Sequence, residues 1–235
     1  MKRLRSLFIT GTDTDVGKTV VTAILGLAYQ KKGINVGYFK PVQSGAERKN
    51  NKLIPPDAEF CRRSLNLNIS AEQLCGYIFE PPVSPHLAAK WAGIKIDPAH
   101  IKTRYDLLTE QYDTLLVEGT GGLLVPLAPN YFIRDLIKTL NLPLIVVARP
   151  GLGTLNHTLL TLECARQAGI KIAGVIINRA PILPDPVVEN NIKTITTMGQ
   201  TKILAVIPVL PSLEREALST IARQPELTEA ISSLI

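Results

Sequence analysis

Six short apolar runs, each followed by glycine, proline or a polar residue, constrain the fold of this chain more than any other feature. They are rich in Val, Ile and Leu and lack polar alternation, a pattern typical of strands that are covered on both faces. The intervals between them are long enough for crossover helices. We therefore expect a doubly wound α/β fold, a three-layer α/β/α arrangement with a mainly parallel sheet between helices. The expected strands are residues 4–10, 35–39, 114–117, 144–148, 173–177 and 203–207.

The intervals predict helices, and proline in the first turn or glycine after the last turn supports several of their boundaries. Residues 46–56 are polar and are expected to form a mobile loop, whereas residues 180–186 contain three prolines, which oppose regular structure. Neither segment has the character of a domain boundary, so we predict one domain over residues 1–235. The expected helices are residues 17–32, 57–66, 85–92, 98–112, 156–168 and 186–198.

Composition and charge exclude several classes of protein. The formal net charge of +6 is spread over both halves of the chain and aromatic residues are few, so no nucleic-acid-binding stripe is expected. No apolar run approaches the roughly 18 residues of a membrane span, and the one after the basic start is shorter than the core of a signal peptide, about 7 residues. Cys61, Cys75 and Cys164 have no paired spacing. We therefore expect reduced thiols and a cytoplasmic protein.

The first expected strand runs directly into a glycine-containing loop that ends in Gly17, Lys18 and Thr19, and a helix follows. In such a P-loop the backbone N–H groups and the helix N-terminus favour phosphate, the lysine reaches the β- and γ-phosphates, and the hydroxyl binds Mg²⁺. The usual pattern has four residues between its glycines, whereas five separate Gly11 from Gly17. The flanking strand and helix nevertheless favour a phosphate-binding loop over a chance Gly-Lys-Thr.

Two further expected strands end in residues that suit the same chemistry. Glu118 follows one strand and precedes a glycine-rich turn, where a carboxylate can bind Mg²⁺. A solvated turn acid is the alternative interpretation. Lys40 and Ser44 follow another strand, at the edge where ligands bind in open α/β sheets, and should face the same crevice as Lys18 from a neighbouring strand end. An equal alternative for Lys40 is that its side chain extends to the surface.

Together these segments resemble the dethiobiotin synthetase family, ATP-dependent cyclo-ligases of biotin synthesis with a P-loop. The sequence differs from the family at Asp15, where many members have Glu, at Thr120, where Ala is usual, and at Arg179, where Asp often follows the asparagine. The resemblance is carried, in family order, by residues 10–19 (TGTDTDVGKT), 40–45 (KPVQSG), 57–58, 82–86, 117–122 and 156–161 and by Asn178.

The resemblance implies that CO2 adds to one amine of 7,8-diaminopelargonate as a carbamate, which attacks the γ-phosphate of ATP before the second amine closes the ureido ring. Lys18 and Lys40 are then the catalytic residues: Lys18 neutralises charge between the β- and γ-phosphates, and Lys40 holds the carbamate and the transferring phosphoryl group. Thr19, Asp57 and Glu118 are the implied Mg²⁺ ligands. Asp57 also opens an expected helix, so an N-cap is its alternative role.

The resemblance also implies which residues contact the nucleotide and the substrate. Asn178 recognises adenine, although a turn-forming asparagine is the simpler interpretation of that residue alone. The nucleotide contacts are Asp15, Val16, Gly17, Lys18, Thr19, Val20, Asp57, Glu118, Gly119, Thr120, Gly121, Asn178, Arg179, Pro208, Val209 and Leu210. The substrate contacts are Thr14, Ser44, Gly151, Leu152, Thr154 and Asn156. The last four surround a helix N-terminus, which favours carboxylates and would hold the substrate tail across a homodimer interface.

Two alternative functions share the P-loop core. A partitioning-type switch ATPase carries a signature lysine five positions before the loop lysine, where this chain has Asp13. A glutamine-dependent amidation enzyme needs an additional glutaminase domain with a cysteine nucleophile, and Cys164 in the interior of an expected helix does not supply one. The histidines lack metal-ligand spacing and are expected to be packing or surface residues. The expected partners are the small-molecule substrate and a second copy of the chain, not nucleic acid or membrane.

Overall fold

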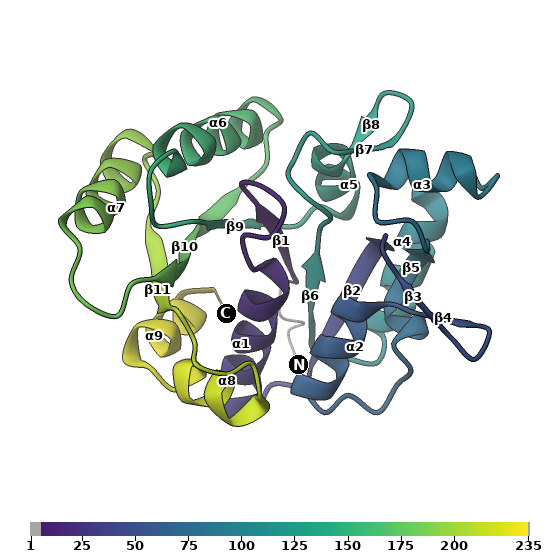
Figure 1. The fold of residues 1–235 in the computed structure, drawn as a ribbon, viewed down its shortest axis with the longest axis horizontal. Helices are drawn as coiled ribbons and strands as arrows, with labels where there is room; N and C mark the ends of the chain where they lie inside the picture. Colours follow the sequence, from purple (N-terminus) through teal and green to yellow (C-terminus); the bar gives the residue numbers. More distant parts are fainter. Residues whose placement is uncertain (1–5, 235) are drawn as a thin grey trace.

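The computed structural model describes residues 6–234 of the chain. In this part a central sheet of seven parallel strands has the order β11-β10-β9-β1-β6-β2-β5 (Figure 1). The chain first builds the sheet on one side of β1 and then on the other, so the strand order reverses at β1. The strands are β1 (Leu7–Gly11), β2 (Val36–Gln43), β5 (Cys75–Ile78), β6 (Thr114–Glu118), β9 (Leu144–Ala148), β10 (Ile172–Ala180) and β11 (Ile203–Pro208).

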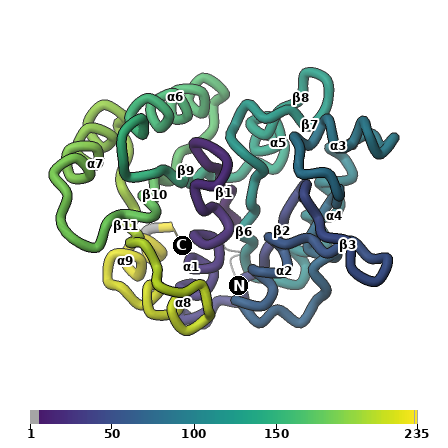
Figure 2. The backbone as a smooth tube through the Cα atoms, in the orientation of Figure 1, coloured from purple at the N-terminus to yellow at the C-terminus, as the bar shows by residue number. Residues whose placement is uncertain are grey.

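Helices cover both faces of the sheet, so the expected doubly wound three-layer fold is confirmed (Figure 1). The chain ends with two helices that return to pack against α1, as the backbone trace in Figure 2 shows. One face carries α1 (Lys18–Lys31), α2 (Pro56–Ser64), α8 (Arg215–Ala222) and α9 (Pro225–Leu234). The other face carries α4 (Pro98–Thr109), α5 (Ile133–Leu140), α6 (Thr154–Gln167) and α7 (Pro186–Met198). Helix α3 (Pro85–Trp91) contacts a small hairpin formed by β7 (Pro126–Ala128) and β8 (Tyr131–Phe132). The 3-10 helix η1 (Glu72–Leu74) contacts β2 and β5.

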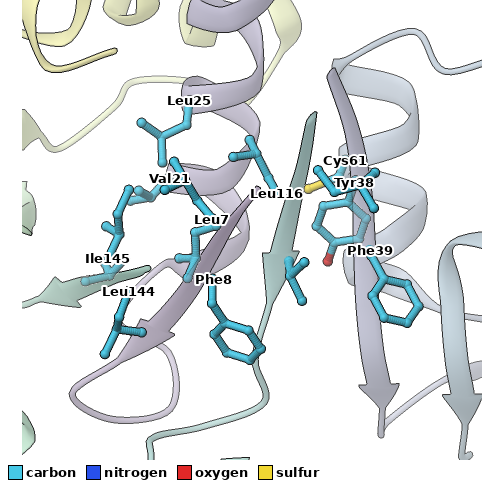
Figure 3. Packing of buried hydrophobic residues seen from close by; sticks show 14 of the residues in the cluster. Leu7, Phe8, Val21, Leu25, Tyr38, Phe39, Cys61, Leu116, Leu144 and Ile145 are labelled. Atoms are coloured by element: carbon cyan, nitrogen blue, oxygen red, sulfur yellow. The ribbon is translucent and has the colours of Figure 1, made fainter. Parts of the chain in front are cut away.

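The apolar core lies on both sides of the central strands. Leu7 and Phe8 of β1 are both buried, and because they are consecutive strand residues their side chains lie on opposite faces of the sheet. Leu7 lies on the side of Val21 and Leu25 of α1, and Phe8 points away from that helix (Figure 3). Burial of one such side chain stabilises the fold by about 1.5–3 kcal/mol. Because both faces of these strands are covered, their sequences contain no polar alternation, which is why they could be recognised as apolar runs.

Strand β2 is longer than the sequence predicted. Its first half, Val36 to Phe39, pairs with β6, and its second half, from Lys40 to Gln43, pairs with β5. The sequence-based boundary at Phe39 was wrong because β5 was not recognised: its four residues include a glycine and lack a long apolar run. Lys40 therefore lies within a strand and not after one.

The expected mobile loop at residues 46–56 is instead a β-hairpin, so that prediction was wrong. Strands β3 (Glu47–Lys49) and β4 (Lys52–Ile54) pair in antiparallel fashion. Asn50 and Asn51 between them have φ angles of 49° and 61°, the left-handed pair that a two-residue type I′ turn requires and asparagine tolerates. Arg48 also donates to Glu80 at 2.7 Å, which ties the hairpin to the following segment.

Helices α5, α8 and α9 were not predicted. For α5 the signal was present, since Ile133, Leu136, Ile137 and Leu140 have helical spacing and are all buried. Helix α6 begins two residues earlier than expected, whereas residues 181–185 are irregular, as their prolines indicated.

None of the helices within residues 6–234 has the length and apolar character of a membrane span. The three cysteines are free thiols, as expected, and residues 4 and 5 of the first expected strand lie outside the described part.

Candidate active site

The carboxyl ends of β1, β6 and β2 border a cavity of about 700 Å³, at the edge where open α/β sheets bind ligands. Strand β6 lies between the other two, so the prediction that Lys18 and Lys40 follow neighbouring strands was wrong. Glu118, at the end of β6, lies between the two lysine-bearing segments. Of the residues predicted for the site, the cavity is lined by Thr14, Asp15, Gly17, Lys18, Thr19, Val20, Lys40, Ser44, Asp57, Glu118, Thr120, Gly121 and Arg179.

The loop between β1 and α1 has a backbone that only particular residues allow. Gly17 precedes α1 with a φ of 90°, and a Cβ at this position would collide with the side-chain amide of Asn178. Asp15 also has a positive φ, 56°. No side chain caps the start of α1, so its first N–H groups are left for an anion. Lys18 Nζ donates to the carbonyl of Asp13 at 3.1 Å, which folds the lysine back along the loop.

A buried ionic cluster lies beside this loop, and we call Lys40, Asp57 and Glu118 the charge cluster. Lys40 Nζ lies 2.7 Å from Asp57 Oδ2 and 2.7 Å from Glu118 Oε1. Thr19 Oγ1 donates to Glu118 Oε1 at 2.8 Å, and the Tyr38 hydroxyl donates to Oε2 at 3.0 Å. A buried charge destabilises the fold unless it is paired with an opposite charge and hydrogen-bonded. For Glu118, Lys40 supplies the opposite charge, and Thr19 and Tyr38 supply hydrogen bonds.

The charges of the site set the protonation of its members. Burial lowers the pKa of Lys18, and the nearby Lys40 ammonium lowers it further. Burial also opposes the charge of Lys40, but Glu118 and Asp57 outweigh it and hold the pKa of Lys40 above its ordinary value. For Asp57 burial favours the neutral acid, yet Lys40 brings the pKa of this carboxyl below its usual range. At neutral pH Lys40 is therefore a cation and Asp57 an anion.

The structure excludes the alternative interpretations of four residues. Lys40 is 2% exposed and does not extend to the surface, and Glu118 is 0% exposed and is not a solvated turn acid. Asp57 does not cap α2, because the N-cap position belongs to Pro55. Asn178 lies in β10 and not in a turn, and its side-chain amide donates to the carbonyl of Val16 at 2.9 Å. Asn178 thereby braces the β1–α1 loop.

The other predicted site residues lie outside the lining of this cavity. They are Val16, Gly119, Asn178, Pro208, Val209, Leu210, Gly151, Leu152, Thr154 and Asn156. Residues 149–153, the β9–α6 loop, project from the molecule: Leu152 is fully exposed, although Thr154 at the start of α6 is buried. Arg149 donates to the carbonyl of Thr14 at 3.1 Å, which connects the β9–α6 loop to the β1–α1 loop.

Some lining residues were not predicted to have a role. Gln43, Ser84 and Val125 line the cavity. The first two lie in segments that carry the family resemblance, KPVQSG and residues 82–86, so a signal existed for them. Tyr38, which contacts Glu118 but does not line the cavity, had no such signal, because an aromatic residue in a buried strand is usually core packing. The further unpredicted lining residues are Pro56, Pro82, Val83 and Pro85.

The donor set suits Mg²⁺ bound together with phosphate. The Thr19 hydroxyl and the Asp57 and Glu118 carboxylates are oxygen ligands, which Mg²⁺ prefers. Within residues 6–234 no group of three or more His, Cys, Asp and Glu side chains is placed to hold a metal ion. A metal here would therefore draw the rest of its ligands from water and phosphate, as Mg²⁺ does at nucleotide sites. Lys18 and the uncapped start of α1 supply the matching phosphate contacts.

Comparison with known proteins identifies close relatives over most of the chain. A family model described as an AAA domain matches residues 5–217. The chain is 41% identical over 214 residues to the ATP-dependent dethiobiotin synthetase BioD of Anoxybacillus flavithermus, covering 91% of this chain and 96% of the relative. Identity to the protein of the same name from Methanococcus vannielii is 44% over 202 residues, covering 86% and 92%.

Solved structures with similar folds are ATPases of a different kind. The septum site-determining protein MinD with Mg-ADP from Pyrococcus horikoshii matches with a TM-score of 0.57 and 20% identity, over 98% of this chain and 93% of the other. A ParA family ATPase from Chlorobium tepidum matches with a TM-score of 0.56 and 16% identity, over 97% of both chains. At these identities the similarity shows the shared fold alone.

Proposed function

The chain belongs to the family of ATP-dependent dethiobiotin synthetases, and we propose that it closes the ureido ring of dethiobiotin from 7,8-diaminopelargonate, CO2 and ATP. One substrate amine takes up CO2 and loses a proton, which leaves a carbamate. A carbamate oxygen displaces ADP from the γ-phosphorus and forms a carbamic-phosphoric anhydride. The second amine attacks the carbonyl carbon of this anhydride, phosphate leaves with the bonding electrons, and the amine releases its proton.

The two lysines provide positive charge on both sides of the transferred group. Phosphoryl transfer between anions depends on positioning and charge more than on covalent help from the protein. Lys18, in the β1–α1 loop, would neutralise charge on the β- and γ-phosphates. Lys40 would hold the carbamate and the moving phosphoryl group, and its raised pKa keeps it a cation throughout the physiological pH range. Ser44, which lines the same cavity, would hydrogen-bond the substrate near its carbamate.

Thr19, Asp57 and Glu118 would hold Mg²⁺ with their oxygens. When bound there, the ion screens the negative charge of the phosphates and helps to orient them. Asp57 and Glu118 are each paired with Lys40. A divalent cation at these carboxylates would compete with the ammonium for the same oxygens and free Lys40 to turn toward the substrate.

The substrate has a second end, and we place its tail carboxylate at the start of α6 in a second copy of the chain. The β9–α6 loop projects from the surface, and Leu152 at its tip is fully exposed. A carboxylate is favoured at a helix N-terminus, which here is Gly153 with a φ of 87° and no side-chain cap. A homodimer would bring Gly151, Leu152 and Asn156 of one protomer to the cavity of its partner.

Adenine would bind between the ends of β10 and β11. Arg179 has a φ of 60° and lines the cavity, and Pro208 and Val209 follow at the end of the adjacent strand. One amide hydrogen of Asn178 is already donated to the carbonyl of Val16. Base recognition would therefore use the other amide hydrogen and the amide oxygen of this side chain. A cytoplasmic location, expected from the thiols and composition, stays a prediction.

The observation that carries the proposal is the convergence of Lys18, Lys40 and the two carboxylates Asp57 and Glu118 on one cavity. We expect the purified protein to release ADP from ATP only when both the diamine and CO2 or bicarbonate are present, with dethiobiotin formed in equal amount. Coupled measurement of ADP and mass spectrometry of the product tests this. ATP hydrolysis at the same rate without the diamine would contradict the ligase function and favour a switch ATPase.

A further inference from the structure

Tyr38 contacts Glu118 of the candidate site from the core side of the sheet, although Tyr38 does not line the cavity. Its side chain is 0% exposed and lies on β2, two residues before Lys40. In Figure 3 it extends into the apolar core beside Cys61. Its hydroxyl donates to Glu118 Oε2 at 3.0 Å. This is a polar contact made by a residue that otherwise packs like a core aromatic.

We propose that Tyr38 is a positioning residue that holds the Glu118 carboxylate in the orientation required at the nucleotide site. The inference rests on the proposed function, because it takes Glu118 as a residue of the Mg²⁺–nucleotide site. The proposal assigns Tyr38, on the core side of the Glu118 carboxylate, a role in orienting that carboxylate.

The two oxygens of Glu118 have different surroundings. Oε1 accepts from Thr19 Oγ1 at 2.8 Å and from Lys40 Nζ at 2.7 Å, and these two donors line the cavity. Oε2 accepts from Tyr38 on the core side. Glu118 itself is 0% exposed, so water cannot replace a missing donor at the surface. Each oxygen therefore depends on the protein for its hydrogen bonds.

The terminal torsion of a glutamate is broad, so a carboxylate held at one oxygen can still rotate. A donor on the opposite oxygen fixes the plane of the carboxylate, and Tyr38 is in that position. Hydrogen bonds behind metal-binding carboxylates typically change metal affinity or activity by about 10–100-fold when they are removed. Without the Tyr38 hydroxyl, Glu118 would also keep a buried oxygen with an unmet hydrogen bond, which favours rotation away from the site.

A Phe substitution separates positioning from packing, because it removes only the hydroxyl. The chain offers a matched control in Tyr29 of α1, which is 1% exposed and whose hydroxyl has no hydrogen-bond partner among residues 6–234. Tyr29→Phe and Tyr38→Phe thus delete the same buried group, once where it contacts Glu118 and once where it contacts no acceptor. Thermal unfolding of both variants reports the contribution to stability alone.

Calorimetric titration with ADP, in Mg²⁺ and in EDTA, tests the role without relying on turnover. We expect Tyr38→Phe to weaken ADP binding about tenfold in Mg²⁺ and less than about twofold in EDTA, the former in line with a lost hydrogen bond behind a ligating carboxylate. Tyr29→Phe should match the wild type in both conditions. Equal weakening of Tyr38→Phe in Mg²⁺ and EDTA, or no weakening at all, would overturn the proposal.

A double-mutant cycle with Glu118→Gln then tests whether Tyr38 acts through Glu118. In the Glu118→Gln background we expect Tyr38→Phe to change Mg²⁺-dependent ADP affinity by less than about twofold, because the carboxylate it positions is gone. Additive losses would contradict the inference. Since ADP binding requires no diamine, this result is independent of the ligase assay: a protein that makes no dethiobiotin can still show the coupling, and an active ligase can lack it.

Discussion

The charge cluster and the β9–α6 loop differ in how completely one copy of the chain builds them. Lys40, Asp57 and Glu118 are joined by contacts of 2.7 Å, and Lys40 and Glu118 are almost wholly buried. The β9–α6 loop has the opposite character, since Leu152 at its tip contacts solvent on all sides. One region has its polar partners already, and the other presents an apolar side chain and an uncapped helix start to the outside.

This contrast separates two kinds of functional residue. Residues of the charge cluster contribute both to stability and to the proposed chemistry, because burial makes each charge depend on its partners. Residues of the β9–α6 loop contribute little to the fold of the single chain, so changes there should affect substrate binding and assembly selectively. Arg149 of the β9–α6 loop donates to the carbonyl of Thr14 at 3.1 Å, which connects this loop to the β1–α1 loop beside the charge cluster.

The largest effect is expected from Lys40→Met, which keeps the length of the side chain and removes its charge. We expect turnover to fall about 10²- to 10³-fold, as when one charge-stabilising donor is removed from an active site. Mg-ADP affinity should change little because Lys18 and the loop N–H groups remain. The free energy of unfolding should fall by about 3 kcal/mol, because two carboxylates lose their shared cation.

Steady-state kinetics, calorimetry and urea unfolding measure these three quantities. Lys193→Met, on the exposed side of α7, is the matched control and should leave all three unchanged. Loss of Mg-ADP binding in Lys40→Met would remove Lys40 from its assigned role beside the carbamate.

A smaller effect is expected at the β9–α6 loop from Leu152→Asp. A charge at this exposed tip should oppose a homodimer and repel the substrate carboxylate, so the KM for the diamine should rise about tenfold, the cost of a lost anchoring contact. ADP affinity and thermal stability of the chain should not change. Sedimentation should show a shift toward monomer. Leu107→Asp, at an exposed position on α4, is the control, and a dimer and a KM that both survive Leu152→Asp would contradict the cross-interface site.

The smallest effect concerns the pH dependence of stability. The pKa of Asp57 is lowered by Lys40, so its ionised form stabilises the fold above its ordinary pKa, and this contribution is lost as pH falls through the lowered value. The difference in unfolding temperature between wild type and Asp57→Asn should be largest near neutral pH and decrease below about pH 4. Asp106→Asn disrupts an exposed pair with Lys102 and should show a smaller difference. A difference for Asp57→Asn that is constant down to acidic pH would show that its charge does not stabilise the fold.

Much of the fold was predictable because its signals are local. Buried parallel strands form continuous apolar runs, and Pro85, Pro98 and Pro186 begin helices as expected, whereas α2 begins at Pro56, one residue before its expected start. The predictions failed where the deciding contact is distant in sequence. Strand β5 exists because β2 offers it an edge, and β2 extends to Gln43 for the same reason.

The candidate site shows the same division. Lys18, Thr19, Lys40 and Glu118 could be named from the sequence, because glycine loops and polar residues that follow apolar runs have a recognisable composition. Their burial, their pairing and the place of β6 between β1 and β2 could not, since these depend on how strands from distant parts of the chain align.

The sequence by itself determined the fold class and which side chains can contact phosphate, because periodicity and glycine spacing are properties of neighbouring residues. Only the tertiary structure decided that Lys40 is held between two carboxylates and that Tyr38 donates to one of them. The physical reason is that a hydrogen bond or ion pair between buried groups depends on the packing of strands and helices that lie far apart in the sequence. An aromatic side chain in a buried strand has the same local pattern whether or not its hydroxyl finds a carboxylate.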